Sequence, residues 1–191
     1  HVYAVGHAKA IQEINYVVEN FLHEGGVFHG AIEVYGQEFS FGGSRANKCG
    51  IFACKPRQCP MHTYRESIYR GDCGLEKEQV QLILGGLKAG WMGPTYDLLR
   101  KNCCSFSREF AYELGVGELP DWIDRLAKWG TEVDNAKRGE IVEVRGAKLE
   151  AKVVEATFFE HVNKFTSYDR MNTLPQDHAC VNYARDELYG G

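Results

Sequence analysis

Two adjacent cysteines, Cys103 and Cys104, carry the strongest chemical signal in this chain of 191 residues. Directly after them Phe106, Phe110 and Leu114 recur every four residues, a spacing that predicts one apolar face of a helix. The pair therefore lies at or just before a helix N-terminus, where free N–H groups and the helix dipole favour a negative charge. A thiol in that place can have a lowered pKa, and its thiolate is a nucleophile.

A nucleophilic thiol needs a base, and His29 is the best candidate. It lies in a β-prone run at 27–35, which Gly36 connects to a second run at 38–42, so the sequence predicts a hairpin. If 27–35 is one strand, alternation places His29 and Glu33 on the same face, about 6–7 Å apart, which is too far for Glu33 to orient the ring. The small residues 30 and 31 leave room for another backbone or a substrate. Cys103 and His29 could then form a thiolate–imidazolium pair.

The same segments resemble a known family. His-Gly-Ala-Ile-Glu-Val-Tyr-Gly-Gln-Glu-Phe at 29–39, and Tyr-Asp-Leu-Leu followed by Asn-Cys and Phe-Ser at 96–107, are similar to the PPPDE family. These are permuted papain-like thiol peptidases that include desumoylating isopeptidases. The segments 50–52 and 119–127 resemble that family too, so the resemblance spans about residues 1–130.

The resemblance implies a fold, a reaction and two site residues. We expect an α+β permuted papain-like fold, with a small antiparallel sheet or barrel packed with helices, at residues 1–130, and a C-terminal extension of unknown role at 131–191. His29 would be the catalytic histidine and Cys103 the nucleophile, acting as a dyad that removes ubiquitin or SUMO from proteins through an acyl-enzyme. The family usually has Asn or another polar residue where this chain has Cys104, which leaves open which sulfur attacks.

Other functions remain compatible with the same residues. A Cys–His dyad would serve equally in a protein S-acyl thioesterase, and Cys104 could have turned the domain into a non-catalytic module that binds a ubiquitin-like modifier. A zinc site is a more distant alternative, because the order Cys49, Cys54, Cys59 and His62 does not match ligand pairs two to four residues apart. We therefore predict no metal and no cofactor.

The composition of the chain indicates which classes of partner and which cellular compartment to expect. Hydrophobic residues make up 44% of the chain, charged residues 25%, and the net charge is −4 with no basic block, which argues against nucleic acid as a partner. No apolar run approaches ~18 residues, so no membrane span is expected. Seven cysteines, an odd number with one adjacent pair and no secretory-signal pattern, favour a reducing compartment, the cytoplasm with the nucleus second. The expected partners are ubiquitin- or SUMO-conjugated proteins; the sequence does not predict an oligomeric state.

The remaining elements follow from periodicity. Apolar residues recur at three- and four-residue spacings in three segments and predict helices at 9–22, 75–88 and 147–165, and a short helix at 121–129. Short β-prone runs predict strands at 1–5, 63–69 and 140–144.

Overall fold

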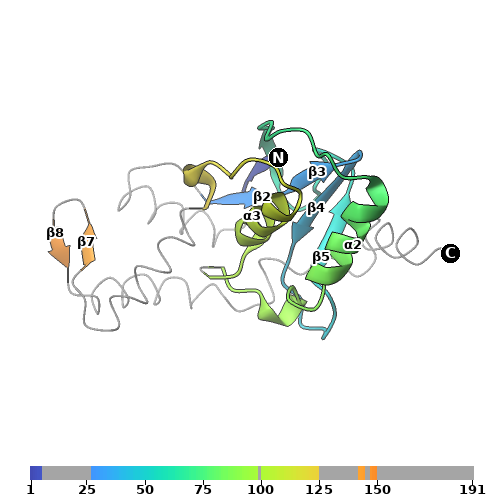
Figure 1. Ribbon diagram of the computed structural model, residues 1–191. Coiled ribbons are helices and arrows are strands. Elements are labelled where there is room, and N and C mark those ends of the chain that lie inside the picture. The colour runs from blue at the N-terminus through green and yellow to red at the C-terminus, as the bar shows by residue number, and fades with distance from the viewer. Residues whose placement is uncertain (6–26, 99, 125–141, 145–146, 150–191) are drawn as a thin grey trace.

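The computed structural model describes residues 1–5, 27–98, 100–124, 142–144 and 147–149 (Figure 1). The predicted helix at 9–22 lies outside these residues. In chain order the elements are β1 (Val2–Ala4), β2 (Phe28–Gly30), β3 (Ile32–Val34), β4 (Gln37–Phe41), β5 (Ile51–Cys54), β6 (Thr63–Glu66), α2 (Lys77–Leu87), the 3-10 turn η1 (Gly93–Thr95), α3 (Cys103–Glu113), the 3-10 turn η2 (Asp121–Asp124), β7 (Val142–Val144) and β8 (Ala147–Leu149).

The strands form antiparallel sheets, which confirms the predicted α+β class. One sheet has the order β2-β1-β6, a second has the order β3-β4-β5, and β7 pairs with β8. Helices α2 and α3 pack against the second sheet (Figure 1). Among the described residues, no helix has the length and apolar character needed to cross a membrane.

The predicted single strand at 27–35 is wrong, because the chain changes sheets at Ala31. The segment before it pairs with β1, with Tyr3 opposite His29, and the segment after it pairs with β4. His29 is consequently buried, whereas Glu33 is exposed and its carboxylate lies 2.6 Å from Nε2 of His1. Alternation cannot reveal this break, because the apolar pattern continues across it.

The predicted hairpin at Gly36 is confirmed. Strands β3 and β4 are joined by Tyr35 and Gly36, with φ angles of 51° and 71°. Positive φ at both central residues is the signature of a type I′ turn, whose twist matches that of the flanking strands.

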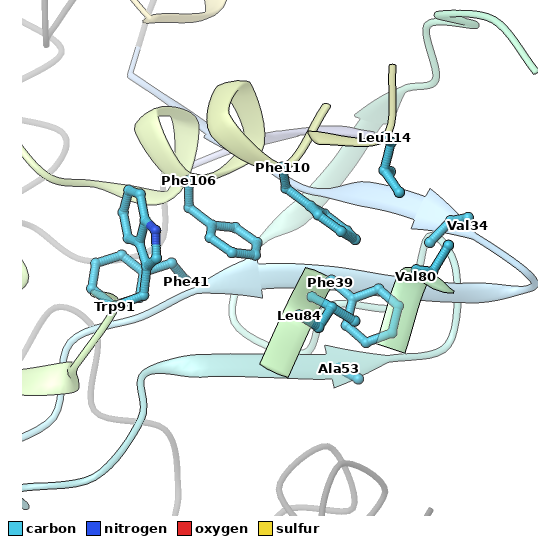
Figure 2. Packing of buried hydrophobic residues seen from close by; sticks show 10 residues of the cluster. All are labelled: Val34, Phe39, Phe41, Ala53, Val80, Leu84, Trp91, Phe106, Phe110 and Leu114. Atoms are coloured by element: carbon cyan, nitrogen blue, oxygen red, sulfur yellow. The ribbon is translucent and has the colours of Figure 1, made fainter. Parts of the chain in front are cut away.

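The main core lies between the second sheet and the two helices (Figure 2). Phe39 and Phe41 of β4 face Phe106 and Phe110 of α3, and the last two side chains are fully buried. Leu114 joins them, so the predicted apolar face of the helix after the cysteines is confirmed. Burial of this face fixes the rotation of α3 about its axis and thereby the direction of its first residues.

The opposite face of β4 is polar and connects the two sheets. Glu38, which is 1% exposed, accepts hydrogen bonds of 2.6 and 2.7 Å from the Tyr3 hydroxyl and one of 2.8 Å from the Arg57 N–H. The Ser40 hydroxyl donates to the Gly30 carbonyl at 2.7 Å. These contacts hold β1 and β2, and so the backbone of His29, against β4.

The other predicted elements have mixed outcomes. Strands at 1–5, 63–69 and 140–144 and the helix at 75–88 are confirmed with shorter bounds, as β1, β6, β7 and α2. Residues 121–124 form a 3-10 turn, and the rest of that predicted helix lies outside the described residues. The helix predicted at 147–165 is wrong at its start, where Ala147–Leu149 pairs with β7. The alternation Val-Glu-Val and Ala-Lys-Leu is a period-two pattern that the three- and four-residue spacing obscured.

Candidate active site

Asn102 places Cys103 at the first position of α3. Its side-chain oxygen accepts the Ser105 N–H at 2.9 Å, and its amide donates to the Leu98 carbonyl at 2.8 Å. Asn is a favoured N-cap because this hydrogen bond satisfies one of the unpaired N–H groups of the first turn. The N–H groups of Cys103 and Cys104 remain without carbonyl partners inside the helix. The predicted position of the cysteine pair, at a helix start, is confirmed.

Gly30 allows β2 and α3 to approach closely. A Cβ atom at this position would lie 3.3 Å from Sγ of Cys104 and 3.4 Å from Oγ of Ser107. The backbone that follows His29 is therefore in contact with the first turns of the helix that begins at Cys103. The small residue next to His29 thus permits the close approach that was expected, and side chains of α3 occupy the space beside it.

His29 lies in a buried pocket of aromatic rings and sulfur atoms. It is 4% exposed, and its ring packs against Tyr3 (5.8 Å between centroids), Phe52 (6.3 Å) and His62 (4.3 Å). The thiols of Cys103 and Cys59 interact with the ring by hydrogen bonding and by charge. Nε2 nevertheless has no well-directed hydrogen bond among the described residues, and catalytic contacts of this kind often tighten only when substrate binds.

The structure thus brings together the two predicted site residues, which are 74 positions apart in the sequence (103 − 29). Burial lowers the pKa of His29, but negative charge on Cys103 and Cys59 outweighs burial and raises the pKa to about 10. A hydrogen bond from Cys104 holds the pKa of Cys103 well below its ordinary value; burial opposes this shift, and the charge of His29 adds to it. These interactions favour the thiolate–imidazolium form of the pair.

The two adjacent thiols have opposite character. Its hydrogen bond to Cys103, followed by burial and by the negative charge of Cys103, raises the pKa of Cys104 well above its ordinary value. Its Sγ also lies 3.5 Å from the Phe28 carbonyl oxygen. The two shifts favour ionisation of Cys103 before Cys104.

Cys59 is a third thiol at this site, and sequence reasoning gave it no role there. A hydrogen bond from Cys54 lowers the pKa of Cys59 to about 5, burial opposes that shift, and His29 adds to it. Cys59 and His62 lie between β5 and β6 and approach His29 together, whereas Cys49 lies near the Trp91 carbonyl. The one available signal was the Cys-x-x-His spacing at 59–62, because the sequence does not show that a distant strand supplies the third member.

The 3-10 turn η2 covers the cysteines. Ile123 packs in one apolar cluster with Cys103, which is 5% exposed, and the Trp122 ring meets the Phe28 ring edge-on at 5.1 Å. An ion pair of 2.5 Å between Arg108 and the buried Asp124 ties η2 to α3. Cys103 is therefore shielded from solvent, in part by η2.

A groove of ≈ 670 Å³ adjoins the covered site. Its lining includes Gly30 and Ala31, which follow His29 directly, Ser107, one turn along α3 from Cys103, and Pro120 before η2. The lining includes neighbours of Cys103 and His29 but neither residue itself. The groove is therefore placed to hold a part of a ligand that extends away from the two reactive side chains.

Comparisons with known proteins identify a family for this chain. The family model described as "PPPDE putative peptidase domain" matches residues 2–139. A DeSI-like protein of Arabidopsis thaliana is 31% identical over 106 residues, and a desumoylating isopeptidase 1 homolog of Caenorhabditis elegans is 32% identical over 106 residues. A DeSI-like protein of Schizosaccharomyces pombe is 32% identical over 108 residues.

The matches cover part of each protein. They take in 56%, 53% and 55% of this chain, and 47%, 32% and 53% of the respective relatives, so the chain spans about half or less of the curated relatives it matches. The family model covers well over half of the chain and includes both β2 and the start of α3. The chain belongs to the PPPDE family.

Proposed function

We propose that this chain is a cysteine isopeptidase that removes SUMO or ubiquitin from conjugated proteins, with Cys103 as nucleophile and His29 as acid and base. The observation that carries the proposal is a thiol with a lowered pKa at a helix start, beside an imidazole with a raised pKa, within a PPPDE domain. The name of the Caenorhabditis elegans relative, a desumoylating isopeptidase, supports SUMO as the first modifier to test.

The chemistry follows from the charge state of the pair. The Cys103 thiolate attacks the carbonyl carbon of the isopeptide bond, and we expect N–H groups of the first turn of α3 to stabilise the oxyanion that develops. The His29 imidazolium gives its proton to the leaving lysine amine, and a thioester joins Cys103 to the modifier. A water molecule then gives its proton to His29 and attacks the thioester, which releases the modifier carboxylate and restores the thiolate.

The chain order supports a permuted papain-like arrangement as part of this proposal. In papain-type peptidases the catalytic Cys precedes the His in sequence, whereas here His29 precedes Cys103. The nucleophile nevertheless begins a helix and the histidine lies on a neighbouring strand. The free thiols of Cys103 and Cys59 suit the reducing environment of the cytoplasm or nucleus, where we place the protein.

Modifier probes with a C-terminal electrophile test the proposal. We expect SUMO or ubiquitin probes to label the wild-type chain, labelling to be lost in Cys103→Ala and His29→Ala, and labelling to persist at pH 8 in the matched control Cys104→Ala. Labelling that survives Cys103→Ala and is lost in Cys104→Ala would assign the nucleophile to the other sulfur. Undiminished labelling of a folded His29→Ala protein would reject the dyad.

The same proteins separate the alternatives. A thioesterase would cleave a fluorogenic acyl thioester much faster than a modifier amide. A binding module would retain a modifier without forming a covalent adduct. Either result, obtained with folded wild-type protein, would contradict the isopeptidase assignment.

A further inference from the structure

A second set of chemically active side chains surrounds His29. Nitrogen atoms of His29 and His62 and the sulfur of Cys59 all lie within 4.8 Å of one another. His29 and Cys59 are 4% and 5% exposed, and His62 is half-buried. Nε2 of His29 is buried without a well-directed hydrogen bond, and a bound ion is one partner that would satisfy it.

The donor set matches one class of ligand. Two imidazoles and one thiolate are the ligands that Zn²⁺ takes in proteins, with bonds of about 2.0–2.1 Å to nitrogen and about 2.3 Å to sulfur. In a tetrahedral site these bond lengths place the donor atoms about 3.3–3.6 Å apart. From the observed limit of 4.8 Å, the donor atoms would have to approach one another by at most about 1.2–1.5 Å. His62 is the least buried of the three and can make most of this adjustment.

The loop between β5 and β6 explains why these donors converge. Cys59 and His62 are three residues apart, and the Cys59 N–H is held by the Tyr3 hydroxyl at 3.4 Å. Tyr3 pairs with His29 in the neighbouring strand, so the loop is anchored beside the imidazole. The fold therefore holds Cys59 beside His29.

We propose that His29, Cys59 and His62 form a Zn²⁺ site that shares the imidazole of the proposed dyad, so that Zn²⁺ binding and turnover exclude each other. The inhibition part of this inference rests on the proposed function, whereas the metal site itself does not. Zn²⁺ binds a ring nitrogen through its lone pair, so a coordinated His29 cannot become the doubly protonated imidazolium that gives its proton to the leaving amine. Zn²⁺ would act as a reversible inhibitor with its own protein ligands beside the nucleophile.

Cobalt substitution tests the site without reference to activity. The full chain, stripped of metal, is titrated with Co²⁺, whose thiolate complexes have a near-ultraviolet charge-transfer band, and Zn²⁺ is then used to displace it. We expect a 1:1 complex with that band in the wild type, loss of the band in Cys59→Ser, and at least tenfold weaker binding in His62→Gln. Cys49→Ser is the matched control, since its thiol lies away from the site, and its titration should equal that of the wild type.

The metal site can also be tested with the wild-type protein alone. Zn²⁺ should protect Cys59 from alkylation by iodoacetamide, as read by peptide mass spectrometry, even if a variant fails to fold. Absence of the charge-transfer band in the wild type, an unchanged band in Cys59→Ser, or alkylation of Cys59 at the same rate with and without Zn²⁺ would overturn the site.

Inhibition is measured separately with the modifier probe. Zn²⁺ should slow labelling of Cys103, a chelator should restore it, and His62→Gln should require at least tenfold more Zn²⁺ for the same fractional inhibition relative to its own metal-free rate. A chain that binds Co²⁺ through Cys59 but reacts with no probe would keep the metal site and reject the proposed function. A chain that reacts with the probe and binds no metal would keep the proposed function and reject the metal site.

Discussion

The single proton of the Cys104 thiol has two acceptors, and its position determines the reactivity of Cys103. One acceptor is the Phe28 carbonyl oxygen, 3.5 Å away, and the other is the Cys103 sulfur. One S–H group can serve only one of them at a time. Hydrogen bonds to ionised acceptors are about twice as strong as those between neutral groups. We therefore expect the proton to point toward the Cys103 thiolate.

Cys104→Ala removes this donor, and its effect can be estimated. A hydrogen bond to a charged group contributes about 1.5–3 kcal/mol, and because a thiol is a weak donor we take about 1.4 kcal/mol, which is a tenfold change in the ratio of thiolate to thiol. The more basic thiolate is also more nucleophilic, by about threefold for this change. When the alkylation rate of Cys103 is plotted against pH, the substitution should lower the rate by about threefold at pH values below the Cys103 pKa. On the alkaline plateau it should raise the rate by about threefold.

The assay is the rate of Cys103 alkylation by iodoacetamide as a function of pH, followed by mass spectrometry of the peptide. Opposite changes on the two sides of the profile cannot come from loose packing, which would lower or raise both. Cys104→Ser retains an O–H donor and should follow the wild-type profile. If the pH profile of Cys104→Ala superimposes on that of the wild type, the S–H group of Cys104 donates to the Phe28 carbonyl, and Cys104 does not lower the pKa of Cys103.

Three further predictions use other parts of the site. The alkylation rate of Cys103 should reach its plateau well below the ordinary thiol range near pH 8.5. Hydrolysis of a modifier amide should decline only when rising pH passes about 10, because the protonated form of His29 persists up to that value. Gly30→Ala should lower probe labelling several-fold and the free energy of unfolding by about 1–3 kcal/mol, measured in urea, because the new Cβ crowds α3 at 3.3 Å. Tyr3→Phe should cost about 1.5–3 kcal/mol in the same titration, because the buried Glu38 carboxylate loses its hydroxyl donor.

Local patterns in the sequence predicted the helix that begins at Cys103 and the hairpin that follows the strand of His29. The four-residue spacing after Cys104 defined the buried face of α3, and Gly36 defined the hairpin, because each depends on residues close in sequence. The identity of Asn102 as the helix cap was also readable in principle, from an Asn followed by Ser at the third helical position. These features were predictable because neighbouring residues alone determine them.

The surroundings of His29 could not be predicted in this way. The change of sheet at Ala31 depends on which strand pairs with which, and the apolar alternation at 27–35 is the same with or without it. Cys59 and His62 reach the ring because Tyr3 holds their loop from another strand. Contacts between three segments that are far apart in the sequence leave no periodic signal.

The same contacts place two thiols, Cys103 and Cys59, in similar surroundings near one imidazole. His29 interacts with two thiols of lowered pKa, and a neighbouring cysteine is the main cause of each shift: Cys104 for Cys103, and Cys54, whose thiol also lies 3.5 Å from Oε1 of Glu38, for Cys59. One imidazolium can neutralise only one thiolate, and a second unneutralised charge in a buried site is costly. The two sulfurs must therefore compete for the same cation. If a thiol donor or a metal ion stabilises the Cys59 thiolate, we expect the thiolate of Cys103 to form less often, so Cys59, which the sequence suggested only as a zinc ligand, should tune the reactivity of the proposed nucleophile.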